Sequence, residues 1–109
     1  MIWDLKFLPE AEKDLHDLNR SQQIVTLKAI KKVQKNPLPQ SEGGYGKPLG
    51  NKRGRNLTGF LKIKLLHEGI RVVYTLIRTK TTMLVVVVGV REDEEVYDIA
   101  AGRREKNNL

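Results

Sequence analysis

The sequence contains no cysteine, and this absence excludes two kinds of structural support. Without thiols the chain has neither a disulfide framework nor a thiolate zinc site, which agrees with a reducing cytoplasm. A membrane-spanning helix needs roughly 20 consecutive apolar residues, whereas the longest apolar run is Met83 to Val88. The N-terminus also lacks the charged-then-apolar pattern of a signal peptide. We therefore expect a cytoplasmic protein that has no membrane partner.

The familiar catalytic motifs are absent as well. The sequence has no pair of histidines at metal-ligating spacing and no GxxxxGK[ST] phosphate-binding loop, and a cysteine nucleophile is excluded. The acidic run Glu92 to Glu95 is better explained as the start of a helix, where carboxylates favour the positive end of the dipole, than as a metal site. A functional site must therefore be sought among the basic residues.

Basic residues are abundant and unevenly distributed. The 109 residues carry a net charge of +7, and the segment from Lys28 to Lys80 holds thirteen basic residues against two acidic ones. The remainder of the chain is consequently acidic. A basic middle segment of this kind indicates a surface for nucleic acid or an acidic partner. The alternative is the ordinary solvated surface of a basic protein.

Periodicity predicts a single domain, residues 1–109, of the α+β class. A short strand over 2–7 precedes a helix that begins at Pro9 and a second helix with Ser21 as its N-cap. This helical hairpin packs on a mostly antiparallel four-stranded sheet. The later elements are an irregular basic loop over 38–56, strands over 59–66, 70–78 and 81–91 with a bulge at Gly89, and a short helix before a frayed tail over 102–109.

The strand over 59–66 defines the candidate site. Leu61, Ile63 and Leu65 alternate with two lysines, so Lys62 and Lys64 lie on its open face. The turn at 68–69 returns the chain into a strand that carries Arg71, which joins the lysines if the register permits. Three cations fixed on a sheet form an anion site, and phosphate is the expected anion.

Four segments at these spacings together resemble the RelE toxins of the RelE/ParE superfamily. The segments are Lys62-Ile63-Lys64-Leu65, Gly69-Ile70-Arg71-Val72-Val73-Tyr74, Val88-Gly89-Val90-Arg91-Glu92 and Glu95-Val96-Tyr97. The resemblance is close over the sheet and the last helix, and looser over the first strand and the helical hairpin. It implies the RelE/ParE-like fold and the toxin component of a type II toxin–antitoxin system.

The activity implied by the resemblance is that of a metal-independent endoribonuclease, an mRNA interferase. Such toxins cut mRNA in the ribosomal A site by attack of a ribose 2′-hydroxyl on the adjacent phosphate, which leaves a 2′,3′-cyclic phosphate and inhibits translation. No cofactor is implied, because the nucleophile belongs to the substrate. The implied partners are the ribosome, mRNA and a cognate antitoxin, which would dock on the basic sheet or displace the last helix.

The resemblance also implies roles for five residues. Lys62 would act as the general base, and Lys64 with Arg71 would stabilise the pentavalent phosphorane. Arg91 would assist the leaving oxygen and Tyr97 would stack on the nucleotide. The surrounding cations would favour the neutral amine that a base at Lys62 requires. Basic side chains of the loop would hold ribosomal RNA through its phosphates, namely Lys47, Lys52, Arg53 and Arg55.

Two alternatives and one departure accompany this interpretation. ParE relatives share the fold but inhibit DNA gyrase without catalysis, and an inactive relative would bind only RNA or an antitoxin. The complete set from Lys62 to Tyr97 favours the nuclease, because a gyrase inhibitor does not need it. RelE toxins often carry a further basic residue shortly after the arginine at position 91, whereas Asp93, Glu94 and Glu95 follow here.

Overall fold

The computed structural model describes residues 2–52 and 54–109, and for residues 51 and 52 it describes the backbone alone. None of the described helices is long and apolar enough to cross a membrane. Along the chain the elements are β1 Asp4–Phe7, α1 Pro9–His16, α2 Arg20–Gln34, the 3-10 helix Gln40–Glu42, β2 Lys47–Lys52, β3 Arg55–Leu65, β4 Ile70–Ile77, the 3-10 helix Arg78–Lys80, β5 Thr82–Gly89 and α3 Asp93–Lys106.

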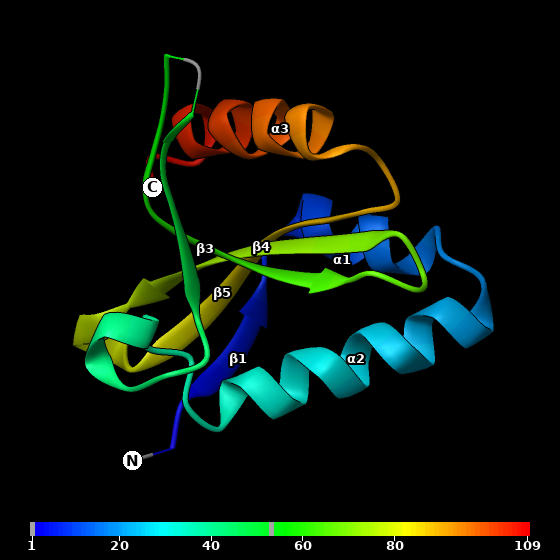
Figure 1. Cartoon of the computed structure of the whole chain (residues 1–109), viewed down its shortest axis with the longest axis horizontal. Coiled ribbons are helices and arrows are strands. Elements are labelled where there is room, and N and C mark those ends of the chain that lie inside the picture. Colours follow the sequence, from blue (N-terminus) through cyan, green and yellow to red (C-terminus); the bar gives the residue numbers. More distant parts are fainter. Residues whose placement is uncertain (1, 53) are drawn as a thin grey trace.

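The sheet has five strands in the order β1-β5-β4-β3-β2, and β1 is parallel to β5 while the other pairs are antiparallel (Figure 1). The α+β class is therefore confirmed, but the predicted count of four strands is wrong. The additional strand, β2, lies inside the segment that we predicted to be a loop. Pro48 and Gly50 hide the alternation of a strand, and the register of β2 against β3 shifts between these two residues.

Helices cover both faces of this sheet: α2 lies on one side and α3 on the other (Figure 1). The N-cap of α2 is Asn19 rather than the predicted Ser21. The Asn19 side chain accepts from the backbone N–H of Gln22, and the Gln22 side chain accepts in return from the backbone N–H of Asn19. This capping box satisfies two backbone donors at once, which Ser21 would not do from inside the first turn.

Strand β5 lies between β1 and β4, and its apolar run is buried as predicted. The register shift falls opposite Val86, between Val73 and Tyr74 of β4, and the bulge predicted at Gly89 is wrong because Gly89 pairs regularly with Arg71. Beyond the end of β1, side chains form hydrogen bonds with backbone groups of β5. The Val88 N–H donates to Asp14 of α1, and Arg103 of α3 donates both to the Val86 carbonyl and to Asp14.

Helix α3 is longer than the sequence suggested. It continues through Gly102 to Lys106, residues that we predicted to belong to a frayed tail. The guanidinium of Arg104 donates to the carbonyls of Asn56 and Thr58 and lies 4.5 Å from the Phe60 ring centroid. These contacts to β3 hold the end of the helix on the sheet.

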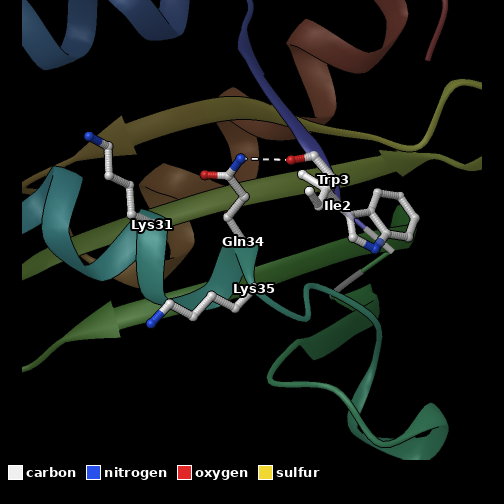
Figure 2. Close-up of a pocket in the computed structure, with 5 residues that line it drawn as sticks. All are labelled: Ile2, Trp3, Lys31, Gln34 and Lys35. Atoms are coloured by element: carbon white, nitrogen blue, oxygen red, sulfur yellow. Dashed lines mark hydrogen bonds between the residues drawn. The ribbon is translucent and has the colours of Figure 1, made fainter.

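A shallow pocket lies where the end of α2 meets the start of β1 (Figure 2). Gln34 Nε2 donates to the Trp3 carbonyl at 2.7 Å and thereby fixes α2 to the strand. Ile2, Lys31 and Lys35 complete the lining. None of these residues belongs to the predicted catalytic set, so this pocket is separate from the candidate site.

Candidate functional site

The register of the sheet brings four basic residues onto one face. Lys64 lies directly opposite Arg71 across β3 and β4, as the anion-site interpretation requires. Lys62 is two residues before Lys64 on β3, so both side chains leave the strand on the same face. On the other side of β3, Lys62 is opposite Lys47 of β2. The cations therefore form a continuous row that crosses three strands.

A carboxylate of α3 is bound between the two cations that face each other. Lys64 Nζ donates to Asp93 Oδ2 at 2.7 Å, and Arg71 Nε donates to Asp93 Oδ1. Each oxygen of the carboxylate thus has its own cation. The side chains of Lys64, Arg71 and Asp93 remain 30%, 20% and 34% exposed. The Lys64 ammonium, and after it the Arg71 guanidinium, lowers the pKa of the Asp93 carboxyl through these hydrogen bonds.

Arg71 also determines the path of the chain that leads into α3. Its Nη1 donates to the Arg91 carbonyl at 2.9 Å and to the Gly69 carbonyl at 3.2 Å. The backbone of Arg91 is therefore held next to the Lys64–Arg71 pair. The Arg91 side chain is 60% exposed, and its Nη1 lies 3.5 Å from Glu95 Oε2 on the first turn of α3. An exposed pair of this length leaves the guanidinium available to a stronger anion.

Tyr97 is buried, unlike the basic side chains of the candidate site. It lies one helical turn after Asp93 and on the same side of α3, the side that faces the sheet. The residue is only 4% exposed and belongs to the hydrophobic core. A ring buried in this way supports the position of α3, and stacking on a nucleotide would require it to become accessible.

A glycine lets α3 approach the strand that precedes it. A Cβ atom at Gly89 would lie 3.3 Å from Val96 Cγ2, which is tighter than ordinary packing. Gly89 is paired with Arg71 in the sheet. The close contact of Gly89 with α3 therefore helps to bring Asp93 within reach of the two cations.

The basic residues predicted to bind ribosomal RNA differ in their exposure and in their partners. Lys47 is exposed at the start of β2, beside Lys62. The Arg55 side chain is only 18% exposed and donates to Glu94 and Asp98 of α3, which raises the pKa of its guanidinium. An RNA contact by Arg55 would need these ion pairs to open. Arg53 and the side chain of Lys52 lie outside the described part of the chain.

The residue that sequence reasoning missed is Asp93. The acidic run was interpreted as complementing the helix dipole, and Asp93 is indeed the first residue of α3. Its second role depends on tertiary placement, because Lys64 and Arg71 lie 29 and 22 residues earlier in the sequence. The only sequence signal was negative: an acidic residue where the resembling family often has a basic one.

Comparison with known proteins places this geometry in a family. No protein-family model matches the sequence. A curated relative, the putative RelE-like toxin protein of Escherichia coli, is 32% identical over 104 residues, which cover 94% of this chain and 98% of the relative. A mutant of the E. coli toxin RelE in its free state superposes with a TM-score of 0.71 at 29% identity, over 94% of this chain and 98% of that one. The toxin of the intact E. coli RelBE toxin–antitoxin complex superposes with a TM-score of 0.64 at 27% identity, over 83% and 98% of the chains. With matching sequence, sheet and helices over nearly its whole length, the chain belongs to the RelE-like toxins.

Proposed function

We propose that this toxin is a ribosome-dependent endoribonuclease that cuts mRNA in the A site and so inhibits translation in the cytoplasm. The observation that supports the proposal best is that Lys64 and Arg71 both donate hydrogen bonds to one oxyanion, the carboxylate of Asp93. The phosphate of an RNA backbone also presents two non-bridging oxygens, so the same pair of donors can bind it. The row of cations from Lys47 to Arg71 continues along the face on which an RNA backbone would lie.

In the proposed reaction the substrate supplies its own nucleophile. Lys62, as the general base, takes the proton of the ribose 2′-hydroxyl while the oxygen forms a bond to the adjacent phosphorus. Lys64 and Arg71 stabilise the charge that develops on the phosphorane. The bond from phosphorus to the 5′-oxygen then breaks, and Arg91 stabilises the leaving oxygen as it takes up a proton from water. The products are a 2′,3′-cyclic phosphate and a free 5′-hydroxyl.

Tyr97 and the partners complete the proposal. We propose that Tyr97 stacks on a base once its ring becomes accessible. The cognate antitoxin would neutralise the toxin by docking on the basic face or by displacing α3. Support for such a partner comes from the toxin–antitoxin complex of the E. coli relative.

Primer extension on mRNA held in programmed ribosomes tests the proposal. The wild-type protein should cut within the A-site codon, and Arg71→Ala should reduce this cutting by about 100-fold or more, as expected when a donor to a developing oxyanion is removed. The matched control is Arg78→Ala, which removes an arginine paired with Glu42 just after the same strand. Arg78→Ala should cut like the wild type, and thermal melting should confirm that both variants fold.

Three results would contradict the proposal. Equal cutting by wild type and Arg71→Ala would remove the phosphate site from the reaction. Inhibition of DNA gyrase with no cut in mRNA would favour the ParE-like alternative. Efficient cutting of naked RNA would exclude dependence on the ribosome, and the nuclease activity itself would then remain.

A further inference from the structure

The proposed phosphate site already contains an anion supplied by the protein. Both oxygens of Asp93 are engaged, one by the Lys64 ammonium and the other by the Arg71 guanidinium. These are the donors that the scissile phosphate would need. A phosphate that approaches this pair must therefore displace the Asp93 carboxylate, since like charges at this distance repel each other.

The backbone around Asp93 is held in place independently of its side chain. Arg55 pairs with Glu94 and Asp98, and Val96 packs against Gly89. At the other end of α3, Arg103 and Arg104 bind α1 and β3. The carboxylate can consequently leave the cations by rotation of its own side chain while the helix stays on the sheet. The charge at the helix N-terminus is retained in either position.

We propose that Asp93 is a specificity-determining residue that occupies the phosphate position in the RNA-free protein and sets a threshold for substrate. This inference rests on the proposed function, because it assigns Lys64 and Arg71 to the scissile phosphate. Free RNA, held by a few phosphate contacts, displaces the carboxylate poorly. An mRNA held by the ribosome is presented in register and displaces it readily, because the cost of ordering the strand has already been met.

Binding of an uncleavable RNA isolates this competition from chemistry. The probe is a fluorescein-labelled RNA hexamer with 2′-O-methyl riboses, and its affinity is measured by fluorescence anisotropy at one fixed salt concentration. Asp93→Asn should bind the hexamer about three- to tenfold more tightly than the wild type, the effect expected from removing a partly exposed competitor. Asp93→Glu keeps the competing carboxylate and should bind like the wild type.

The matched control separates this competition from a general change in charge. Glu92→Gln changes the net charge equally, one residue away, and Glu92 makes no side-chain capping bond to the helix. It should change the affinity by less than about twofold, as expected at physiological salt for an exposed charge that does not occupy the phosphate position. In a protein that also carries Lys64→Ala and Arg71→Ala, the gain from Asp93→Asn should disappear, because both contested cations are missing. Thermal melting accompanies each variant.

The outcomes distinguish this inference from the function on which it rests. If Arg71→Ala weakens binding and stops cutting, but Asp93→Asn binds no more tightly than Glu92→Gln, the phosphate site stands and the competition is overturned. If Asp93→Asn binds more weakly than the wild type while Asp93→Glu restores binding, Asp93 positions the cations instead and the inference is also overturned. If Arg71→Ala neither weakens binding nor stops cutting, the proposed phosphate site falls, and the inference falls with it.

Discussion

At the scale of single residues, one short segment of α3 neutralises much of the positive charge around the candidate site. Acidic side chains from its first two turns reach basic residues on β3, on β4 and on the connection from β5. The pairs are Lys64 and Arg71 with Asp93, Arg55 with Glu94 and Asp98, and Arg91 with Glu95. A count of basic residues therefore overstates the charge that this face offers to RNA.

Replacement of Tyr97 separates packing from chemistry. Tyr97→Ala removes a ring that is only 4% exposed and should cost about 3–5 kcal/mol of stability. Tyr97→Phe keeps the ring and should cost about 1 kcal/mol. If the ring is what RNA uses, Tyr97→Phe should also retain most of the cutting. The measurement is thermal melting combined with primer extension, with cutting expressed per folded molecule.

One result of comparing Tyr97→Phe with Tyr97→Ala would contradict a role for the ring. A Tyr97→Phe variant that melts like the wild type yet cuts as poorly as Tyr97→Ala would assign the work to the hydroxyl group. Loss of cutting by Tyr97→Ala alone decides nothing, because unfolding produces the same loss.

The sequence allowed the cations of the site to be predicted, but not their partners. Alternation along β3 puts Lys62 and Lys64 on one face, and the turn at 68–69 then brings Arg71 opposite, so local rules suffice. Asp93 reaches the same point only because α3 folds back over the sheet. Arg55, which we expected to contact RNA, is paired with α3 for the same reason. The periodicity of a sequence does not determine which segments far apart along the chain come into contact.

At the scale of elements, α3 is the part that fixes the site, and one glycine lies in its interior. Gly102 has no heavy atom within 4 Å of the position that a Cβ would occupy. Gly102→Ala should therefore raise the free energy of unfolding by about 0.5–1 kcal/mol, because alanine loses less conformational entropy in a helix. Urea denaturation followed by circular dichroism measures this change.

Two further substitutions control for the expected gain in α3. Gly102→Pro should cost about 3 kcal/mol or more, since proline breaks a helix interior. Gly89→Ala places its Cβ 3.3 Å from Val96 and should destabilise the protein. If Gly102→Ala left stability unchanged and Gly102→Pro were tolerated, the chain beyond residue 102 would be frayed in solution, as the sequence alone had suggested.

The other elements show why some boundaries were predicted well and others were not. Strands β4 and β5 have the β-branched, apolar composition that identifies a strand directly. Strand β2 has the composition of a loop and is a strand only because β3 pairs with it. Asn19 and Ser21 are both good N-cap residues, and the glutamine at position 22 decides between them through the capping box.

At the scale of the whole molecule, stability should depend on acidic pH through carboxyl groups with lowered pKa values. Hydrogen bonds from Lys64 to Asp93, from Arg78 to Glu42 and from its own backbone N–H to Glu10 lower the pKa of each carboxyl. Such groups stabilise the folded state above their unfolded pKa, about 4, and this contribution is lost as the pH falls through the lower folded value. The melting temperature should be level from neutral pH to about 5 and fall below about pH 4.

Asp93→Asn isolates one of these contributions. At neutral pH the variant should melt below the wild type, because the two ion pairs of Asp93 are missing. The difference should close as the pH falls, since the wild-type carboxyl becomes protonated. A difference that stayed constant between pH 7 and pH 2 would mean that the ion pairs do not stabilise the folded protein.

The parallel pairing of β1 with β5 has a consequence for how the protein is made. A growing chain emerges with its N-terminus first, yet β1 pairs in the sheet with a strand that begins at residue 82. Until β5 has been synthesised the first strand therefore has no partner in the sheet, and Asp14 of α1 lacks its contacts to β5 and α3. Asp93 and the rest of α3 follow all five strands in the sequence. The nascent toxin consequently completes its fold, and closes its site, only after α3 has left the ribosome.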